Sequence, residues 1–435
     1  QGVGRFELSS DKRKELNLQV RPFNLAERGI RPKETNMVDD FLHLVETFRP
    51  DLIAVSCVED TYPQGRYLLN QIKNRRIPTL MGGVFTTFAP HIAIKEAVID
   101  MVCVGEGEEA LVELCERMAT GQDYHDVRNL WVKGPDGEIR RNPQRPVLDV
   151  NTLPMMDFEI FEENRIYRPM AGRVYRMIPI ETHRGCPYTC TYCNSPSQVA
   201  LHNENRAGRF FRKRKMEKVR DEIAYLVKRW NAEYIYFPAD TFLAWSDAEF
   251  REFIEMYGEF QIPFWCQTRP ETITGDVVDL LKSVGCHRMS LGIEHGNEQF
   301  RREVIDRRIA NEELITRANI VGEKIPVSVN NVTGFPKETR DLAFDTIRMN
   351  RELRVDTMNC YTFMPYHGTS LRQLAVKLGY LKRDAVTCSL TAGSVLDMPQ
   401  YSRAEIWGIV RTFSLYARLQ EDLWPKIRRA EIDDD

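Results

Sequence analysis

The chain has 435 residues, more than one hydrophobic core usually holds, and its length predicts two domains, or three if the last is small. With 43% apolar and 28% charged residues it has the composition of a globular protein, which excludes a long disordered or collagen-like tract. The net charge of -3 excludes attraction to nucleic acid or to an anionic membrane by bulk charge, so any partner must be chosen by a local site.

Neither a membrane span nor a secretion signal is visible in the sequence. No window approaches the roughly 18 consecutive apolar residues of a membrane helix, and the chain starts at Gln1 without a charged-then-apolar leader. We therefore expect a cytoplasmic protein. Seven of the ten cysteines are scattered singly, which predicts buried thiols and no disulfide framework.

The first part of the chain alternates short apolar runs with stretches in which apolar residues have helical spacing. The strand candidates are 51–57, 79–83 and 101–104. Repeated strand, loop and helix units predict an α/β fold with a doubly wound, Rossmann-like parallel sheet over 1–125, whose ligands lie at the C-terminal strand ends. The loops that would share this edge are 56–65, 82–91 and 104–108.

Glycine and proline then interrupt the periodicity and indicate a linker over 126–175, with a hairpin at NLWVKGPDGEIRR. From residue 176 onward, six strand candidates alternate with five helical stretches. This order predicts a partial (β/α)6 barrel over 176–370 with its active site at the C-terminal strand ends, followed by a helical C-terminal subdomain over 371–435. The strand candidates read MIPIET, YIYFPA, FWCQTR, HRMSLGIE, VSVNNVTGF and TMNCYTFM.

Three cysteines lie within eight residues, in the segment RGCPYTCTYCN directly after the first barrel strand. Thiolates at Cys186, Cys190 and Cys193 could hold three corners of a cubane iron–sulfur cluster and leave one iron open to another molecule. Two other interpretations stay open, a structural zinc site completed by His183 and three ordinary loop thiols. A polar loop that contains Gly and Pro gives no packing reason for cysteine, which favours the cluster.

The CxxxCxxC spacing, with an aromatic residue before the last cysteine, resembles the radical S-adenosylmethionine (SAM) superfamily. Further segments resemble, in chain order, the strand-end motifs of its subgroup with an N-terminal cobalamin-binding domain: YFPADTF, CQTRPE, LGIEHGNE, TGFPKET and MPYHGTSL. The resemblance covers roughly residues 50–415. It implies a [4Fe-4S] cluster on the three cysteines, SAM on the open iron, and cobalamin.

By the same resemblance, Tyr192 would lie beside the adenine of SAM and Asp240 would accept its ammonium group, although the glycines that precede this acidic residue in the family are missing here. The ribose, the carboxylate and the adenine edge would be reached by Gln267, Arg269, Ser290, Glu294, Gly334 and Phe335. Loop packing, a helix cap, a structural ion pair or a tight turn are the alternative roles for these positions.

The segments SCVEDT, GGVFTTFAP and VCVGEGEEAL resemble the cobalamin-binding fold. They would place the following residues around the corrin and the nucleotide tail: Glu59, Asp60, Thr61, Tyr62, Gly82, Gly83, Thr86 and Gly105. No Asp-x-His-x-x-Gly element occurs, so that motif supplies no histidine to cobalt, and the first strand of the fold is absent or displaced. A domain that retains only the fold is the alternative.

The last barrel strand and its loop carry four candidate acid/base or radical-quenching groups, Cys360, Tyr361, Tyr366 and His367, which we expect to face the substrate. No spacing rule selects one of them, and core or loop packing is the alternative for each. The dense basic run at 206–220 predicts a solvated approach to a helix, while an anionic substrate, an acidic electron carrier or RNA are the alternatives.

The resemblance implies methyl transfer to an unactivated carbon or phosphorus centre by 5′-deoxyadenosyl radical chemistry, with a small-molecule substrate and a flavodoxin or ferredoxin as electron donor. The alternatives are a cobalamin-associated radical enzyme that does not methylate, such as an anaerobic cyclase or a ring-rearranging oxidoreductase, and a radical SAM enzyme with a degenerate cobalamin domain. A non-enzymatic zinc or iron–sulfur module would cleave no SAM. A methylthiotransferase is less favoured, because the N-terminal cysteines do not indicate a second cluster.

Overall fold

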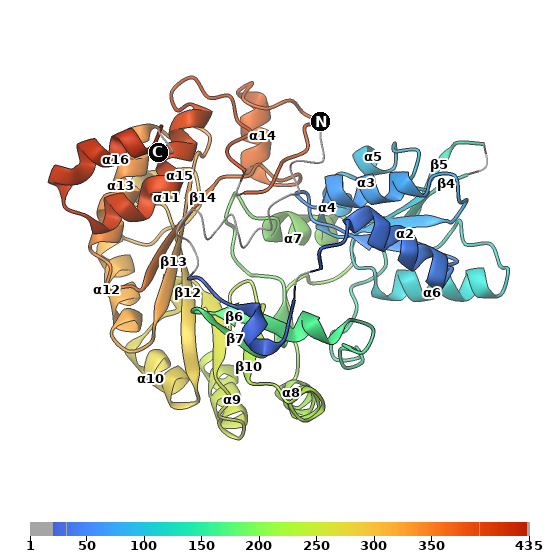
Figure 1. Ribbon diagram of the computed structural model, residues 1–435, viewed down its shortest axis with the longest axis horizontal. Coiled ribbons are helices and arrows are strands. Elements are labelled where there is room, and N and C mark those ends of the chain that lie inside the picture. Colours follow the sequence, from blue (N-terminus) through green and yellow to red (C-terminus); the bar gives the residue numbers. More distant parts are fainter. Residues whose placement is uncertain (1–20, 32, 135, 391, 433–435) are drawn as a thin grey trace.

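The computed structural model describes residues 21–31, 33–134, 136–390 and 392–432 and contains two large sheets with helices around them (Figure 1). The first sheet has five strands in the order β1-β2-β3-β4-β5, and the second has seven in the order β14-β13-β12-β11-β10-β7-β6. Residues 1–20 of the expected first domain lie outside the described residues. In the described part of the chain, no helix combines the length and the apolar character needed to cross a membrane.

The parallel core of the first sheet confirms the predicted Rossmann-like arrangement. Strands β1 (Ile53–Ser56), β2 (Thr79–Gly82) and β3 (Met101–Cys103) run parallel, so the loops after them meet at one edge. The helices around them are α2 (Met37–Phe48), α3 (Tyr62–Gln71), α4 (Val84–Phe88), α5 (Pro90–Ala93) and α6 (Glu108–Ala119).

The hairpin that the sequence places in the linker instead extends this first sheet. Strands β4 (Leu130–Lys133) and β5 (Ile139–Arg141) pair antiparallel, and β4 also pairs antiparallel with β3. Leu130 and Val132 point into the core of this domain, whereas Trp131 and Lys133 are half-buried. This apolar alternation gives the hairpin a buried face and therefore a place in the sheet.

The second sheet confirms the six predicted barrel strands, which form a curled half-barrel (Figure 1). They are β7 (Arg173–Pro179), β10 (Tyr234–Phe237), β11 (Phe264–Thr268), β12 (Cys286–Glu294), β13 (Val327–Thr333) and β14 (Thr357–Thr362), with β6 (Tyr167–Met170) added antiparallel at one edge. Along β13 and β14 buried and half-buried residues alternate, so one face packs on helices and the other lines the inside of the half-barrel. The helices of this domain's outer layer are α8 (Met216–Trp230), α9 (Asp247–Gly258), α10 (Gly275–Ser283), α12 (Asn311–Gly322) and α13 (Arg340–Arg351).

The C-terminal region is helical, as predicted, and its longest helix belongs to the barrel. Helix α15 (Arg403–Arg418) contacts β14 and α13, so it continues the series of outer helices after the last strand. Ser402 and Glu405 form a capping box at its start, and Ile406 and Phe413 belong to the barrel core. Helix α14 (Ser370–Lys377) precedes it in the chain, and α16 (Trp424–Ala430) follows it and packs against it.

Candidate active site between the two domains

The three clustered cysteines lie on one loop at the C-terminal edge of the half-barrel. This loop follows the short strand β8 (His183–Arg184) and ends at α7 (Ser195–Glu204). Cys186 and Cys190 are buried and Cys193 is half-buried. Among the described residues, no three His, Cys, Asp or Glu side chains converge closely enough to hold a single metal ion. In a cubane cluster each thiolate binds a different iron, so the three sulfur atoms need not converge on one point.

Each of the three sulfur atoms has a hydrogen-bonding group beside it. The Thr241 hydroxyl lies 3.3 Å from Cys186 Sγ, a guanidinium nitrogen of Arg269 lies 3.2 Å from Cys190 Sγ, and the backbone N–H of Ser195 lies 3.4 Å from Cys193 Sγ. Hydrogen bonds and positive charge stabilise thiolates. This donor set therefore fits three deprotonated, metal-bound cysteines.

The acidic and amide residues expected at SAM lie close to this loop. Asp240 accepts a hydrogen bond from the Ser195 hydroxyl at 3.2 Å, which joins the end of β10 to the start of α7, and burial raises the pKa of the Asp240 carboxyl. Gln267 donates from Nε2 to the carbonyl of Ala239 at 3.2 Å. Both side chains lie at C-terminal strand ends, where the sequence places them.

Arg269 connects the cluster loop to a buried ion-pair network. Its guanidinium lies 3.8 Å from the ring centroid of Tyr188, and it donates to Glu271 at 2.6 Å. Arg307 donates to the other oxygen of Glu271, also at 2.6 Å, and to the carbonyl of Gly292 at 2.7 Å. Burial alone would raise the pKa of Glu271, but Arg307 and Arg269 outweigh it and lower the pKa to about 2. Neither Glu271 nor Arg307 is among the site residues expected from the sequence.

Glu294 ends β12 in a strained position. Its φ of 68° is left-handed, which is uncommon for a residue other than glycine, and the strand register shifts between Gly292 and Glu294. Burial raises the pKa of the Glu294 carboxyl, although Arg307, 3.6 Å away, opposes this shift. The Tyr192 hydroxyl acts in the same direction as Arg307 on the pKa of this carboxyl. Two residues expected at SAM, one on the cysteine loop and one on β12, thus lie near each other.

The turn after β13 is held by a carboxylate that the sequence analysis does not single out, although it belongs to the motif TGFPKET. Glu338 is fully buried, and one of its oxygens accepts the backbone N–H groups of Gly334 at 2.5 Å and Phe335 at 2.9 Å. Gly334 has a φ of +89°, which glycine adopts without strain. The Phe335 ring lies 6.1 Å from Tyr192, which brings the two expected adenine contacts together.

The candidate substrate-facing groups do not all face the inside of the half-barrel. Tyr361 lies on the inner face of β14, whereas Cys360 is buried in the core on the helix side, because successive strand residues point to opposite faces. The prediction that Cys360 faces the substrate is therefore wrong. Ser290 accepts a hydrogen bond from the Trp265 indole at 3.0 Å, and these two side chains also lie on inner-face positions.

His367, the fourth of these groups, lies where the two domains meet. Glu59 extends from the loop after β1, is buried, and accepts the backbone N–H groups of His367 at 2.8 Å and Thr387 at 2.9 Å. The His367 ring lies 2.9 Å from the same carboxylate and 5.6 Å from the Phe85 ring. The His367 carbonyl accepts from Asn194 next to Cys193. Tyr366, directly before His367, is half-buried, and burial raises its pKa.

The other residues expected at cobalamin take part in the structure of the first domain. Tyr62 is buried against Phe85, and the Thr86 hydroxyl donates to the carbonyl of Cys103 at 2.9 Å. Gly83 has a φ of +104°, and an added Cβ would lie 2.2 Å from the Cys57 carbonyl oxygen. Four further positions lie at the same sheet edge. The carbonyls of Thr61 and Gly82 and the N–H of Gly105 are hydrogen-bonded, and burial raises the pKa of the half-buried Asp60.

A second contact between the domains is made by Glu106, in the loop after β3. It pairs with Arg184, beside the cysteine loop, at 3.0 Å and with Arg212 on β9 (Arg212–Lys213). Burial alone would raise the pKa of Glu106, but the two arginines outweigh it and lower the pKa to about 2. Part of the basic run is therefore committed to internal ion pairs: Arg212 binds Glu106, Lys213 binds Glu249 and Arg214 binds the buried Glu222.

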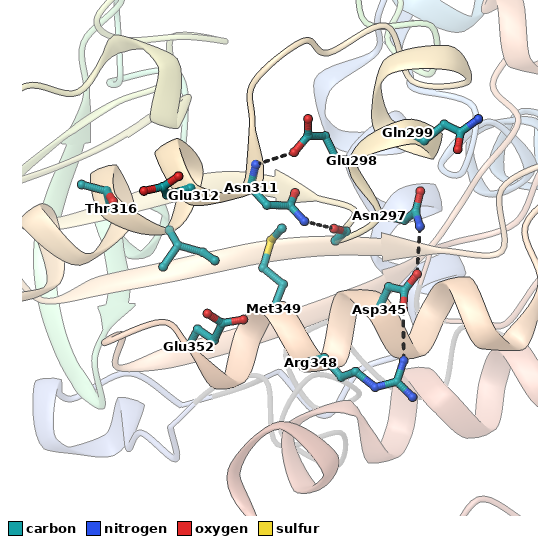
Figure 2. A pocket seen from close by; sticks show the side chains of 12 residues that line it. Asn297, Glu298, Gln299, Asn311, Glu312, Thr316, Asp345, Arg348, Met349 and Glu352 are labelled. Atoms are coloured by element: carbon teal, nitrogen blue, oxygen red, sulfur yellow. Dashed lines mark hydrogen bonds and ion pairs between the residues drawn. The ribbon is translucent and has the colours of Figure 1, made fainter.

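A separate hollow of about 660 Å³ lies among α11 (Glu298–Glu303), α12 and α13 (Figure 2). Its polar side chains bond one another: Asp345 accepts from Asn297 at 2.9 Å and from Arg348 at 3.1 Å, and Glu298 accepts from the backbone of Asn311. None of the residues expected to bind cofactor or substrate lines this hollow.

Two family models match the chain, the radical SAM superfamily over residues 180–349 and the B12 binding domain over residues 24–115. This chain belongs to the radical SAM enzymes that carry a B12-binding domain. The cofactors of these two domains are a [4Fe-4S] cluster, SAM and cobalamin. The two matches lie on the two sheets that Glu59 and Glu106 join.

Related proteins have similar domains over most of this chain. An uncharacterised methyltransferase of Pyrococcus horikoshii is 25% identical over 87% of this chain and 81% of its own length. The anaerobic magnesium-protoporphyrin IX monomethyl ester cyclase of Cereibacter sphaeroides is 26% identical over 82% of this chain, which spans 60% of the cyclase. The solved radical SAM methyltransferase TsrM of Kitasatospora setae, with tryptophan and a SAM analogue bound, shares the fold with a TM-score of 0.62, at 17% identity, over 91% of this chain and 81% of TsrM.

Proposed function

We propose that this enzyme transfers a methyl group to an unactivated carbon or phosphorus centre of a small molecule by cobalamin-dependent radical SAM chemistry. The observation that supports this most strongly is the junction itself, where the cysteine loop of one domain and the cobalamin-type sheet edge of the other are joined through Glu59 and Glu106. The methyltransferase among the relatives, which matches 87% of this chain, supports the same choice.

Cys186, Cys190 and Cys193 are the proposed ligands of the cluster. The open iron would bind SAM, whose carboxylate would find the guanidinium of Arg269 beside Cys190. Asp240, Glu294 and the turn at Gly334 are the proposed contacts of its ammonium, ribose and adenine groups. When bound, the cofactors supply a 5′-deoxyadenosyl radical and a transferable methyl group, and the protein's part is to orient them and to exclude water.

The sheet edge of the first domain is the proposed cobalamin site, in the loops that contain Asp60, Thr61, Gly82, Gly83 and Gly105. Glu59 and Thr86 would support these loops without contacting cobalamin, because their side chains already form hydrogen bonds within the protein. A flavodoxin or ferredoxin is the proposed electron donor, and Tyr361 on the inner face of β14 is the side chain we propose nearest to the substrate.

A radical cyclase is the second candidate, because the Cereibacter relative is named as an anaerobic cyclase and matches 82% of this chain. The two reactions differ in what becomes of SAM. Methyl transfer converts one SAM to S-adenosylhomocysteine and cleaves another to 5′-deoxyadenosine. A cyclase that uses only the radical forms no S-adenosylhomocysteine.

The test is anaerobic incubation of the reconstituted enzyme with hydroxocobalamin, a chemical reductant and SAM that carries a deuterated methyl group. We expect both 5′-deoxyadenosine and S-adenosylhomocysteine, and neither product from the Cys193→Ala variant. Formation of 5′-deoxyadenosine alone would contradict methyl transfer and favour the cyclase. A matched control is Cys388→Ala, which changes a half-buried cysteine outside the cluster loop.

A further inference from the structure

Cys186 lies beside a residue that the proposed cofactor contacts do not use. Thr241 follows Asp240 in the turn after β10 and is 2% exposed. Its hydroxyl oxygen lies 3.3 Å from Cys186 Sγ, and the sulfur is itself buried. A buried hydroxyl needs a hydrogen-bond partner, and this sulfur is within reach.

The direction of this hydrogen bond follows from the state of the sulfur. A thiolate bound to iron carries no proton, so it can only accept, and the Thr241 hydroxyl must donate. The other two sulfurs accept hydrogen bonds from different kinds of donor, the charged guanidinium of Arg269 and the backbone N–H of Ser195. Thr241 is therefore the one neutral side-chain donor among these three contacts.

The backbone of Thr241 is fixed by a second buried residue. The ring Nε2 of His183 lies 3.1 Å from the Thr241 carbonyl oxygen, and its Nδ1 lies 3.1 Å from the hydroxyl of Thr182. A carbonyl only accepts, so Nε2 carries the proton and Nδ1 of the neutral ring accepts from Thr182. His183 lies on β8, directly before the cysteine loop. The bond therefore connects the turn after β10 to the start of that loop.

We propose that Thr241 is a positioning residue that raises the reduction potential of the cluster by donating a hydrogen bond to the Cys186 thiolate, with His183 holding it in place. A hydrogen bond to a ligating sulfur withdraws electron density and stabilises the reduced cluster more than the oxidised one. The inference rests on the proposed assignment of Cys186 as a cluster ligand. It explains why a hydroxyl, and no apolar side chain, occupies this buried position.

The test compares Thr241→Val, which removes the hydroxyl at nearly constant shape, with Thr241→Ser, which keeps it. Each variant is reconstituted anaerobically, its iron is counted, and its reduction potential is measured by a redox titration followed by electron paramagnetic resonance. We expect a more negative potential for Thr241→Val and an unchanged one for Thr241→Ser. The matched control is Thr189→Val, whose hydroxyl lies on the same loop and donates to Asp306 at 2.6 Å instead of to a sulfur.

The outcomes separate this inference from the proposed function. Failure of the unaltered protein to assemble a cluster overturns the proposed function and the inference together. A cluster of unchanged potential in Thr241→Val overturns the inference alone. If Thr241→Val retains no iron, Thr241→Ala is measured in its place, and loss of iron from both would make Thr241 a structural residue and overturn the inference as well.

Discussion

Arg307 is 2% exposed and contacts three residues of the site, although charged residues adjoin it on both sides in the sequence. It bonds both Glu271 and the carbonyl of Gly292, and it lies 3.6 Å from Glu294. Through Glu271 it also fixes Arg269 against the cluster loop. The charge balance of the site thus depends on a side chain that contacts none of the cysteines.

We predict that Arg307→Met lowers the free energy of unfolding by about 3–5 kcal/mol, because it removes the buried guanidinium and leaves the half-buried carboxylate of Glu271 with one partner fewer. The matched control is Arg308→Met, whose side chain is 79% exposed and which should change stability by less than about 0.5 kcal/mol. Urea denaturation of the two variants measures the difference. Equal effects at the two positions would contradict the assignment of Arg307 to a buried network.

At this scale the sequence indicated candidate residues at strand ends, but it did not indicate Glu271 and Arg307, which support them. Arg269, Asp240 and Glu294 follow strands, and the structure places them near the cysteine loop. Glu271 and Arg307 are 36 residues apart, and no local spacing rule connects them. Cys360 and Tyr361 adjoin each other, and only the pairing of β14 with β13 decides which of the two faces inward.

At the scale of elements, the strand-to-helix turns determine how close the loops of the first domain can approach. Gly83 directly precedes α4 with a φ of +104°, and its Cα hydrogen faces the backbone of Cys57, which directly follows β1. Any side chain there would push the loops after β1 and β2 apart. These are two of the loops that we propose for cobalamin.

We therefore predict that Gly83→Ala destabilises the first domain by several kcal/mol, since it adds a steric clash with the Cys57 carbonyl to the backbone strain of roughly 1–2 kcal/mol. Gly121→Ala is the control, because Gly121 also has a positive φ but has no atom within 4 Å of an added Cβ. This variant should be destabilised only by the backbone strain, because the added methyl group meets no other atom. Differential scanning calorimetry of the two variants measures this, and equal losses would contradict the predicted clash.

The type of each element was predictable because apolar spacing determines it. The sheet or domain that each element joins was not predictable. The helical pattern of 403–418 identifies α15, but only its contact with β14 and α13 makes it part of the barrel. Likewise, the hairpin of β4 and β5 was expected from its turn residues, while its pairing with β3 is a tertiary contact. Domain boundaries drawn from composition alone therefore stay predictions.

At the scale of the whole molecule, two carboxylates, the buried Glu59 and the half-buried Glu106, hold the domains together at the edge that carries the site. Glu106 bonds Arg184 and Arg212, and it also accepts the backbone N–H of Leu148 in the connecting segment at 3.1 Å. Glu59 bonds the segment that carries His367. The contact of Glu106 with Arg184 spans 78 positions and that of Glu59 with His367 spans 308, so sequence patterns could not predict them.

We predict that Glu106→Gln weakens the junction by roughly 1.5–3 kcal/mol, because it removes charge-assisted hydrogen bonds. Glu108→Gln is the control, since Glu108 is more exposed and pairs with Arg184 only at the surface. Hydrogen exchange of the peptide that contains Leu148 reports the change. Exchange that is equally fast in both variants would contradict the role of Glu106.

The same contact predicts a response to pH. The pKa of Glu106 is about 2 in the folded chain, below its usual value of 4.5, so its stabilising contribution is complete above pH 4.5 and is lost as the pH falls toward 2. Protection of the Leu148 amide should therefore decrease over this range. In the Glu106→Gln variant that decrease should be smaller, and an identical decrease would assign the acid sensitivity to other groups.

The most direct test of the account is metal analysis of the chain after anaerobic cluster reconstitution with hydroxocobalamin and removal of unbound cofactor. The account predicts about four irons and one cobalt per chain, with the iron lost and the cobalt retained when Cys186, Cys190 and Cys193 are all changed to alanine. Zinc in place of iron would contradict the cluster. Four irons without cobalt would contradict cobalamin-dependent methyl transfer.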